Sequence, residues 1–305
     1  MDLFEINKTI PDETTRKKII YEICNNFNFV SSEIIGKSVC GRNINALRIG
    51  NKSRSAIWIG AHHGMEWIST SILLNFIIEI CEKIYNKNII MNGINILECL
   101  KTRGLTIVPC LNPDGVEISL YGPKEDNLRF FDKKSLENKD FFKSWQANAH
   151  GIDLNHNYNA GWKELRELEI KNGIKKPCAT RYGGETPESE PETIAITNYC
   201  RNNFFTYAIA FHSQGEEIYW DYGNEKLSFS ENFAKIFAIS SGYIVSQPEG
   251  LAVGGGFKDW FIKEIKRPAF TVELGKGKNP LPICTFEKVY NKIKNTLYIS
   301  TLINV

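Results

Sequence analysis

The sequence has almost no excess of charge of either sign, because its 305 residues include 37 Lys and Arg against 35 Asp and Glu. A net charge of +2 provides no basic footprint of the kind that binds nucleic acid. Hydrophobic residues make up 42% of the chain, which is too large a share for a disordered protein. We therefore expect a folded protein that has no nucleic acid among its partners.

The sequence also lacks the features of a secretory leader and of a membrane span. Residues 1–18 contain no basic segment followed by an apolar one, and their charges begin at Asp2. The most apolar run, residues 68–84, is interrupted by serine, asparagine and glutamate side chains. These absences predict a cytoplasmic protein with no membrane partner.

Cysteine is present, but in no pattern typical of a disulfide framework or a zinc knuckle. The eight cysteines are scattered, and no two of them form a C-x-x-C pair. We expect reduced, mostly buried thiols, which agrees with a cytoplasmic location. The oligomeric state leaves no mark on the sequence.

Short apolar runs alternate with helical patterns along the chain. The runs that predict buried strands are residues 56–60, 105–108, 207–211 and 269–274. Apolar spacing predicts helices over residues 68–80, 229–237 and 286–302, with Gly242 ending the second. The alternation indicates an α/β fold, a single domain over residues 1–305 with a helical lead-in at 1–30 and helices on both faces of one sheet.

Two local patterns give further predictions. Ser189, followed three residues later by Glu192, has the spacing of a capping box and predicts the start of a helix. The charged segments 123–140 and 163–176 predict surface loops or solvated helices.

Histidine is rare, and its few occurrences lie in three short segments. The five histidines are His62 and His63 in WIGAHHGMEWIS, His150 and His156 in NAHGIDLNHNYNAGW, and His212 in AIAFHSQGEEIYW. His63 and Glu66 are one helical turn apart, so their side chains can converge on one metal ion. A catalytic zinc usually has three protein ligands drawn from His, Asp and Glu, and His212 after an apolar strand is the candidate for the third.

Each of these signals also has a purely structural interpretation. A histidine near a strand end is more often a hydrogen-bonded structural residue than a ligand, and H-x-x-E arises easily by chance. Glu273 lies in an apolar strand, where a carboxylate is costly to bury unless it is paired or functional. Alternation would place Thr271 and Glu273 on one face, however, and an edge strand could expose that face to solvent. The residues alone leave both interpretations of Glu273 open.

Six segments together resemble the zinc metallocarboxypeptidase family. In chain order they are GAHHGMEW, LNPDGV, GIDLNHNYNAGW, AFHSQGEEIYW, GGFKDW and FTVELG. Within this family the chain is most similar to the bacterial γ-D-glutamyl-diaminopimelate endopeptidases, which cut the stem peptides of peptidoglycan. The resemblance implies a mixed eight-stranded sheet between helices and one Zn²⁺ per chain. It also implies that His63, Glu66 and His212 are the zinc ligands and that Glu273 is the general base for a metal-activated water.

The chain departs from the family pattern at its arginines. Carboxypeptidases normally read DLNRN, in which the asparagine and the arginine bind the terminal carboxylate of the substrate. Here Asn155 is followed by His156, so the arginine is lost. This loss favours an endopeptidase or a substrate with an unusual acid group. The carbonyl-polarising arginine has no clear counterpart either. Gln146 and His150 are the nearest candidates, and Arg129 is more distant.

Two positions near GGFKDW bear on specificity. Leu251 aligns with the tyrosine that caps the active site in the pancreatic enzymes. Lys258 aligns with the base of the pocket that reads the residue after the scissile bond. A lysine there favours an acidic group such as the second carboxylate of meso-diaminopimelate, although a lysine on a helix surface fits the sequence as well.

The leading hypothesis is a zinc peptidase that hydrolyses the γ-D-glutamyl-meso-diaminopimelate bond of peptidoglycan-derived peptides, with Asn155, His156, Lys258 and His150 as substrate-binding candidates. Two alternatives remain. One is a zinc deacylase of N-acyl amino acids, and the other is a catalytically silent domain that binds wall peptides, prompted by the missing arginines. Retention of all three ligands and Glu273 argues against the silent domain.

Overall fold

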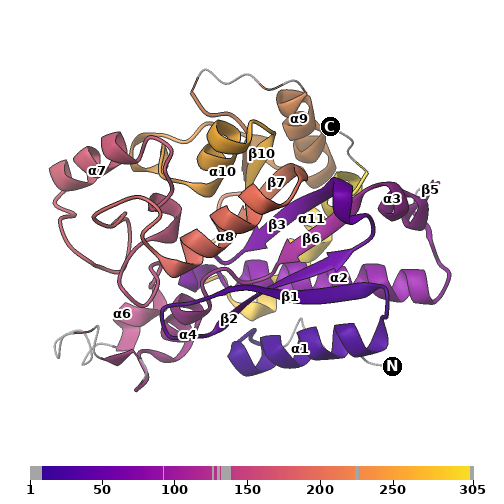
Figure 1. The fold of residues 1–305 in the computed structure, drawn as a ribbon, viewed down its shortest axis with the longest axis horizontal. Helices are drawn as coiled ribbons and strands as arrows, with labels where there is room; N and C mark the ends of the chain where they lie inside the picture. The colour runs from indigo at the N-terminus through magenta and orange to yellow at the C-terminus, as the bar shows by residue number, and fades with distance from the viewer. Residues whose placement is uncertain are drawn as a thin grey trace.

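A mixed eight-stranded sheet forms the centre of the computed structural model, which describes residues 9–91, 93–125, 127–128, 131, 139–223, 227 and 229–302 (Figure 1). The strand order is β1, β2, β6, β3, β7, β10, β8, β9. The strands are β1 (Val30–Lys37), β2 (Asn43–Ile49), β3 (Ser55–Gly60), β6 (Gly104–Val108), β7 (Phe205–His212), β8 (Glu217–Tyr219), β9 (Ile244–Val245) and β10 (Ala269–Glu273). A separate ribbon consists of β4 (Ile90–Met91) and β5 (Ile94–Asn95).

Helices cover both faces of this sheet, as predicted (Figure 1). The helices are α1 (Glu13–Asn26), α2 (Ile68–Tyr85), α3 (Ile96–Thr102), α4 (Pro113–Tyr121), α6 (Lys139–Lys143), α7 (Trp162–Lys171), α8 (Pro191–Asn202), α9 (Ser230–Ser241), α10 (Phe257–Trp260) and α11 (Phe286–Ser300). Apolar side chains of α1, α2, α3, α9 and α11 form one core cluster with the strands. Side chains of α8 and α10 form a second cluster with other strand residues.

Helix α2 is largely apolar, and the structure buries most of its side chains. All six apolar positions predicted for its inner face are buried: Ile68, Ile72, Leu73, Phe76, Ile77 and Ile80. By length and composition alone, the segment Gly64–Tyr85 could cross a membrane, but 83% of its most apolar window is buried inside the protein. These side chains therefore already have protein neighbours.

The arrangement of the central strands determines where the site forms. The four predicted strands correspond to β3, β6, β7 and β10. β7 is parallel to both β3 and β10, so the carboxyl ends of these three strands meet at one edge of the sheet. β10 pairs with β7 on one side and with β8 on the other. It is therefore not an edge strand, and the interpretation that a sheet edge exposes Glu273 is wrong.

The predicted capping box is also wrong. Helix α8 begins at Pro191, its N-cap residue is Glu190, and no side chain caps it. Ser189 instead donates a hydrogen bond to the Glu190 carboxylate and accepts one from the Asn157 side chain. The proline occupies the first helical position, where a missing N–H costs nothing, and this moves the N-cap one residue past the serine.

Two other predictions, both about burial, hold only in part. Helix α9 packs through Ala234, Phe237 and Ser241, so Ile236 and Phe229 of the predicted apolar set are 41% and 64% exposed. All eight cysteines are free thiols, but only three of them are buried. The charged segment 163–176 is largely helix α7, one of the two predicted forms, whereas residues 126, 129–130 and 132–138 of the segment 123–140 lie outside the described residues.

Candidate active site

The connection from β3 to α2 carries the first two predicted metal ligands. His63 precedes a single 3₁₀ turn, Gly64–Glu66, in which the Glu66 N–H donates to the His63 carbonyl at 3.1 Å. This turn packs against α4 so closely that a Cβ at Gly64 would lie 2.2 Å from the carbonyl oxygen of Gly115. The close approach requires glycine at position 64, and the turn brings His63 and Glu66 to one side.

His212, the last residue of β7, completes a cluster with them. Oε1 of Glu66 lies 3.0 Å from Nδ1 of His63, and Oε2 lies 2.9 Å from Nδ1 of His212. One donor atom from each of the three residues lies within 4.8 Å of the others. Ligands at zinc distances in a tetrahedral site are roughly 3.4 Å apart. The three residues therefore have the chemistry and the spacing that a zinc ion requires.

The charges around this cluster also favour a cation. Burial raises the pKa of Glu66, but attraction to His63 and His212 outweighs burial and lowers that pKa to about 2. Burial, and then repulsion from Glu66, raises the pKa of Glu273 well above its ordinary value. The buried carboxylates of Glu66 and Asp153 thus contact the two imidazoles, and a divalent ion would balance their negative charge.

Asp153 is a site residue that the sequence analysis missed. Its Oδ1 accepts hydrogen bonds from Nε2 of His63 at 3.0 Å and from the Asn155 N–H at 3.1 Å, and its Oδ2 accepts one from the Arg181 N–H at 2.8 Å. A carboxylate on the outer ring nitrogen fixes the orientation of a metal-binding histidine and leaves the other nitrogen for the metal. The available signal was the DLN motif, in which this aspartate precedes Asn155.

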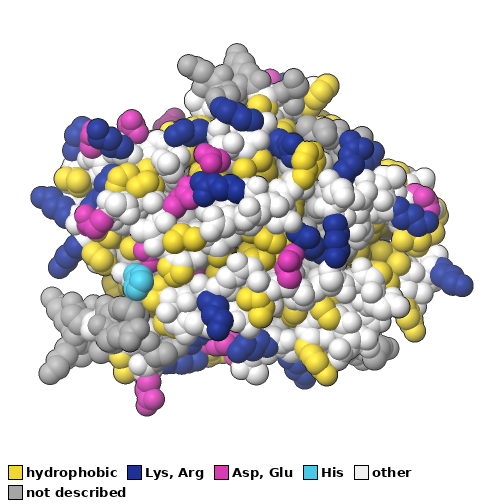
Figure 2. All heavy atoms as spheres, viewed as in Figure 1, with side chains coloured by type: hydrophobic (Ala, Val, Ile, Leu, Met, Phe, Trp, Pro, Cys, Tyr) yellow, Lys and Arg dark blue, Asp and Glu magenta, His cyan; other side chains and the backbone are white. Residues whose placement is uncertain are grey.

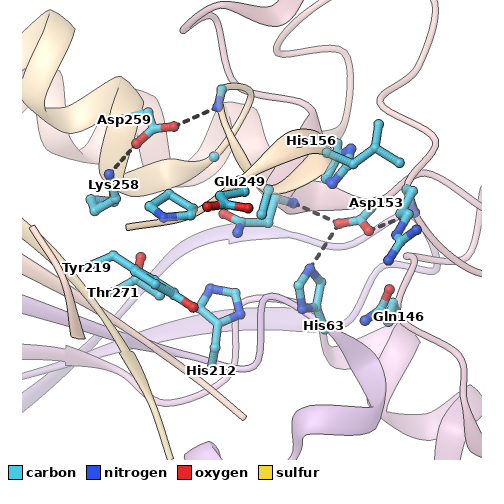
Figure 3. A pocket seen from close by; sticks show the side chains of 18 of the residues that line it. His63, Gln146, Asp153, His156, His212, Tyr219, Glu249, Lys258, Asp259 and Thr271 are labelled. Carbon is cyan, nitrogen blue, oxygen red and sulfur yellow. Dashed lines mark hydrogen bonds and ion pairs between the residues drawn. The ribbon is translucent and has the colours of Figure 1, made fainter. Parts of the chain in front are cut away.

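The cluster opens into a cavity of about 470 Å³ (Figure 3). Glu273 lines this cavity and is paired in register with His212 on the neighbouring strand. Within the described residues, no group donates a hydrogen bond to the Glu273 carboxylate. Three of the four predicted substrate-binding residues, Asn155, His156 and Lys258, line the same cavity.

The structure separates the remaining candidates. His150 is not among the residues that line the cavity, and its Nδ1 lies 2.8 Å from the Glu190 carboxylate. Gln146 lines the cavity and lies beside His63 in Figure 3. Leu251, at the position where the resemblance expects a tyrosine, is also a lining residue. Arg129 lies outside the described residues.

His156 and Lys258 both contact acidic side chains. Nδ1 of His156 lies 2.8 Å from the buried Glu169 carboxylate. The Lys258 ammonium donates to the Asp259 carboxylate and to the Asp221 carbonyl. Lys258 and Asp259 are only 6% and 4% exposed, and burial raises the pKa of Asp259 despite its cationic neighbour. A substrate would therefore meet Lys258 and Asp259 as a pair of opposite charges.

The backbone orients Asn155. Its Oδ1 accepts a hydrogen bond from the Phe257 N–H at 3.0 Å, and a Cβ at Gly256 would lie 3.2 Å from the same oxygen. Among the described residues, its Nδ2 has no acceptor. This amide is therefore available to a ligand in the cavity.

Comparisons with known proteins agree with this geometry. The model of the zinc carboxypeptidase family, peptidase M14, matches residues 25–296. Gamma-D-glutamyl-L-diamino acid endopeptidase 1 of Lysinibacillus sphaericus is 35% identical over 87% of this chain, which spans 66% of that protein, just under two thirds of its length. The uncharacterized protein YqgT of Bacillus subtilis (strain 168) is 34% identical over 95% of this chain and 76% of its own length. Bovine thrombin-activatable fibrinolysis inhibitor, solved with a tick carboxypeptidase inhibitor, shares the fold with a TM-score of 0.74 and 22% identity, over 98% of this chain and 99% of that one.

Proposed function

Since this chain belongs to the zinc carboxypeptidase family and is a peptidase, we propose that it hydrolyses the amide bond between γ-D-glutamate and meso-diaminopimelate in peptidoglycan stem peptides. One arrangement carries the proposal. The cavity is lined by His63 and His212 of the cluster, by Glu273, which has no hydrogen-bond donor among the described residues, and by Lys258 (Figure 3). The similarity to an endopeptidase for γ-D-glutamyl-L-diamino acids supports the same substrate class.

The reaction requires a nucleophilic water and a group that moves its proton. His63, Glu66 and His212 would hold a zinc ion, which when bound polarises the scissile carbonyl and lowers the pKa of a water molecule. Glu273 accepts the proton of the attacking water, because its carboxylate faces the cavity and has no competing donor among the described residues. It then passes the proton to the nitrogen of the leaving amine.

Gln146 takes the role that an arginine has in the family pattern. Its Oε1 accepts a hydrogen bond from the Thr180 hydroxyl, so its Nε2 is left to donate to the substrate. We assign this amide to the carbonyl oxygen, where negative charge develops as the water adds. The side chain lies beside His63, on the side of the cavity away from Lys258 (Figure 3).

The leaving amine belongs to diaminopimelate, whose side chain ends in one carboxylate and one ammonium. Lys258 and Asp259 present opposite charges to the cavity, together with Tyr219 and Thr271 (Figure 3). We assign the carboxylate to Lys258 and the ammonium to Asp259. Charged pairs in a largely buried site are stronger than the same contacts in water.

The test is to incubate the zinc-loaded protein with L-Ala-γ-D-Glu-meso-diaminopimelate and to identify the products by mass spectrometry. The proposal predicts release of L-Ala-D-Glu. The matched peptide with L-Lys in place of diaminopimelate lacks the distal carboxylate, and we expect it to be cleaved roughly 10-fold more slowly or worse. Lys258→Met should remove most of this difference.

Three outcomes would count against the proposal or one part of it. An absence of cleavage with one zinc bound per chain would overturn it, and hydrolysis of N-acetyl amino acids under the same conditions would favour the deacylase. Equal rates on the two peptides would refute the role of Lys258 while leaving the peptidase activity intact.

A further inference from the structure

The guanidinium of Arg181 differs from the other positively charged groups at the cavity. Arg181 lines the cavity and is exposed. Lys258 is paired with Asp259, and His156 with Glu169. Within the described part of the chain, the Arg181 side chain has no ion pair and no hydrogen bond. Its charge is therefore available to a ligand.

The backbone holds Arg181 firmly against the site. Its N–H donates to Oδ2 of Asp153 at 2.8 Å, and its φ of 67° is in the left-handed region, which is uncommon for a residue other than glycine. The flanking residues are fixed as well, because the Ala179 carbonyl accepts the Gln146 N–H at 2.9 Å and the Tyr182 carbonyl accepts the Asp153 N–H at 2.8 Å. These hydrogen bonds therefore hold the backbone of Arg181 in place beside the cavity.

Arg181 lies on one particular side of the reacting centre. Asp153 joins Arg181 to the cluster, because its other oxygen accepts the hydrogen bond from His63. In Figure 3, Asp153 and Gln146 lie on one side of the cavity, and Lys258 and Tyr219 lie on the other. If the Lys258 side takes the leaving amine, the Arg181 side takes the acyl portion of the substrate.

Building on the proposed function, we propose that Arg181 determines specificity by binding a free carboxylate on the acyl-side residue. In a γ-linked glutamate the side-chain carboxyl forms the scissile amide, so the α-carboxylate stays free and charged close to the reacting carbon. A guanidinium can bind such a carboxylate through two parallel hydrogen bonds. The enzyme would then recognise one carboxylate on each side of the bond, with Arg181 and Lys258.

The experiment compares two tripeptide substrates that differ in one group. In the first, the α-carboxylate of the D-glutamate is free. In the second it is the neutral amide, which has the same shape. We expect wild-type kcat/KM to be roughly 10- to 100-fold higher for the free acid, the range for hydrogen bonds to a charged group. Arg181→Gln should lower the value for the acid alone and bring the two substrates within about 3-fold of each other.

A matched control and a binding measurement complete the test. Arg54→Gln removes an exposed arginine outside the cavity and should leave both rates unchanged. Calorimetry of the product L-Ala-D-Glu, and of its amide, with zinc-loaded wild type and Arg181→Gln reports binding without turnover. Equal zinc content in the two proteins shows that Asp153 and His63 are undisturbed.

The outcomes separate this inference from the proposed function. If wild type cleaves both substrates equally, or if Arg181→Gln slows both to the same extent, the role of Arg181 is overturned and the peptidase activity stands. If wild type cleaves neither substrate, the proposed function fails. The role of Arg181 is then tested only by the calorimetric binding of L-Ala-D-Glu. Weaker binding of L-Ala-D-Glu to Arg181→Gln would then support the role of Arg181, and equal binding would overturn it.

Discussion

At the residue scale, three carboxylates within one site have different roles because they have different partners. Glu66 lies between the Nδ1 atoms of His63 and His212. Asp153 accepts a hydrogen bond from the outer nitrogen of His63 and from two backbone N–H groups. Glu273 faces the cavity without a donor among the described residues. These contacts predict different effects when each acid is replaced by its amide.

Replacing Glu273 by glutamine should abolish proton transfer and leave the cluster intact. The amide keeps the shape of the side chain but cannot accept a proton, so we expect kcat to fall by about 100- to 10,000-fold. Bound zinc, measured by elemental analysis, should stay at the wild-type value, because Glu273 is not one of the three clustered residues. A rate of hydrolysis equal to that of wild type would contradict the assignment of Glu273 as the base.

Replacing Asp153 by asparagine should weaken zinc binding. The variant loses the charged acceptor that orients His63, and we expect zinc affinity to fall by about 10- to 100-fold. Competition with a chromogenic chelator measures this change. Asp140→Asn is the control, because Asp140 is exposed and forms an ion pair with Lys143 on its own helix. Wild-type affinity in Asp153→Asn would contradict the orienting role.

The site was predictable from the sequence only where its contacts are local or repeat a known motif. His63 and Glu66 share one turn, which is visible in their spacing. The hydrogen bond from His63 to Asp153 joins residues 90 positions apart, and no local pattern reports it. The contact of His150 with Glu190, 40 positions away, has no local pattern either, and it lies away from the residues that line the cavity.

At the scale of elements, packing between backbones positions the ligands. The turn that holds Glu66 contacts the start of α4 at Gly64 and Gly115, and each of these glycines leaves no space for a Cβ. The Met65 and Gly64 N–H groups also donate to the carbonyls of Trp145 and Gln146 at 2.8 and 2.9 Å. The metal cluster therefore depends on the contact of this turn with two other segments.

Gly64→Ala should destabilise the protein and weaken zinc binding together. Its Cβ would clash with the Gly115 carbonyl, and overpacking of this kind costs about 1–3 kcal/mol. Chemical unfolding and chelator competition measure the two effects. Gly173→Ala is the comparison, because a Cβ there meets no atom of the described residues within 4 Å and only the strain of its φ of 83° remains. Normal zinc binding by Gly64→Ala would refute this coupling.

Elements with a long and consistent pattern were predicted well, and their ends and faces less well. Helix α2 follows its apolar spacing because both the sheet and α11 pack against it. Helix α9 carries more apolar side chains than its neighbours can cover, so the sequence overestimates its buried face. The position of Pro191 decided the start of α8, against a capping pattern that fitted equally well by spacing.

At the scale of the whole molecule, charge is distributed without a dominant sign. On the face in Figure 2, Asp and Glu side chains lie scattered among Lys and Arg side chains. Inside the protein, the carboxyl group of Glu192 is fully buried near that of Asp114. It accepts hydrogen bonds from the Val39 N–H and the Asn148 side chain, each at 3.1 Å. Burial, and then repulsion from Asp114, raises the pKa of Glu192 to about 8.

This buried acid predicts a pH-dependent stability. The folded state binds the Glu192 proton more tightly than the unfolded state, so the contribution of Glu192 to the free energy of unfolding should fall as the pH rises from about 4.5 to about 8. Glu192→Gln cannot ionise, and its stability relative to wild type should therefore increase over that range. Urea unfolding of both proteins at pH 5 and pH 8 measures the difference in the free energy of unfolding between Glu192→Gln and wild type. His150 and Glu190 titrate nearby in both proteins, so their effects largely cancel in the comparison. If this difference in the free energy of unfolding is the same at pH 5 and pH 8, Glu192 is ionised in the folded state at both pH values.

The place of β10 in the sheet has a consequence for the order in which a ribosome makes this protein. β10 lies between β7 and β8, both of which precede it in the chain. While residues 269–273 are still untranslated, the gap between these strands stays open, yet His63, Glu66 and His212 have already been synthesised. Glu273 belongs to the strand that fills this gap. A nascent chain that ends before residue 269 would therefore contain the three metal-ligand candidates but not the candidate base. Hydrolysis that depends on Glu273 would therefore require residues 269–273 to have joined the sheet.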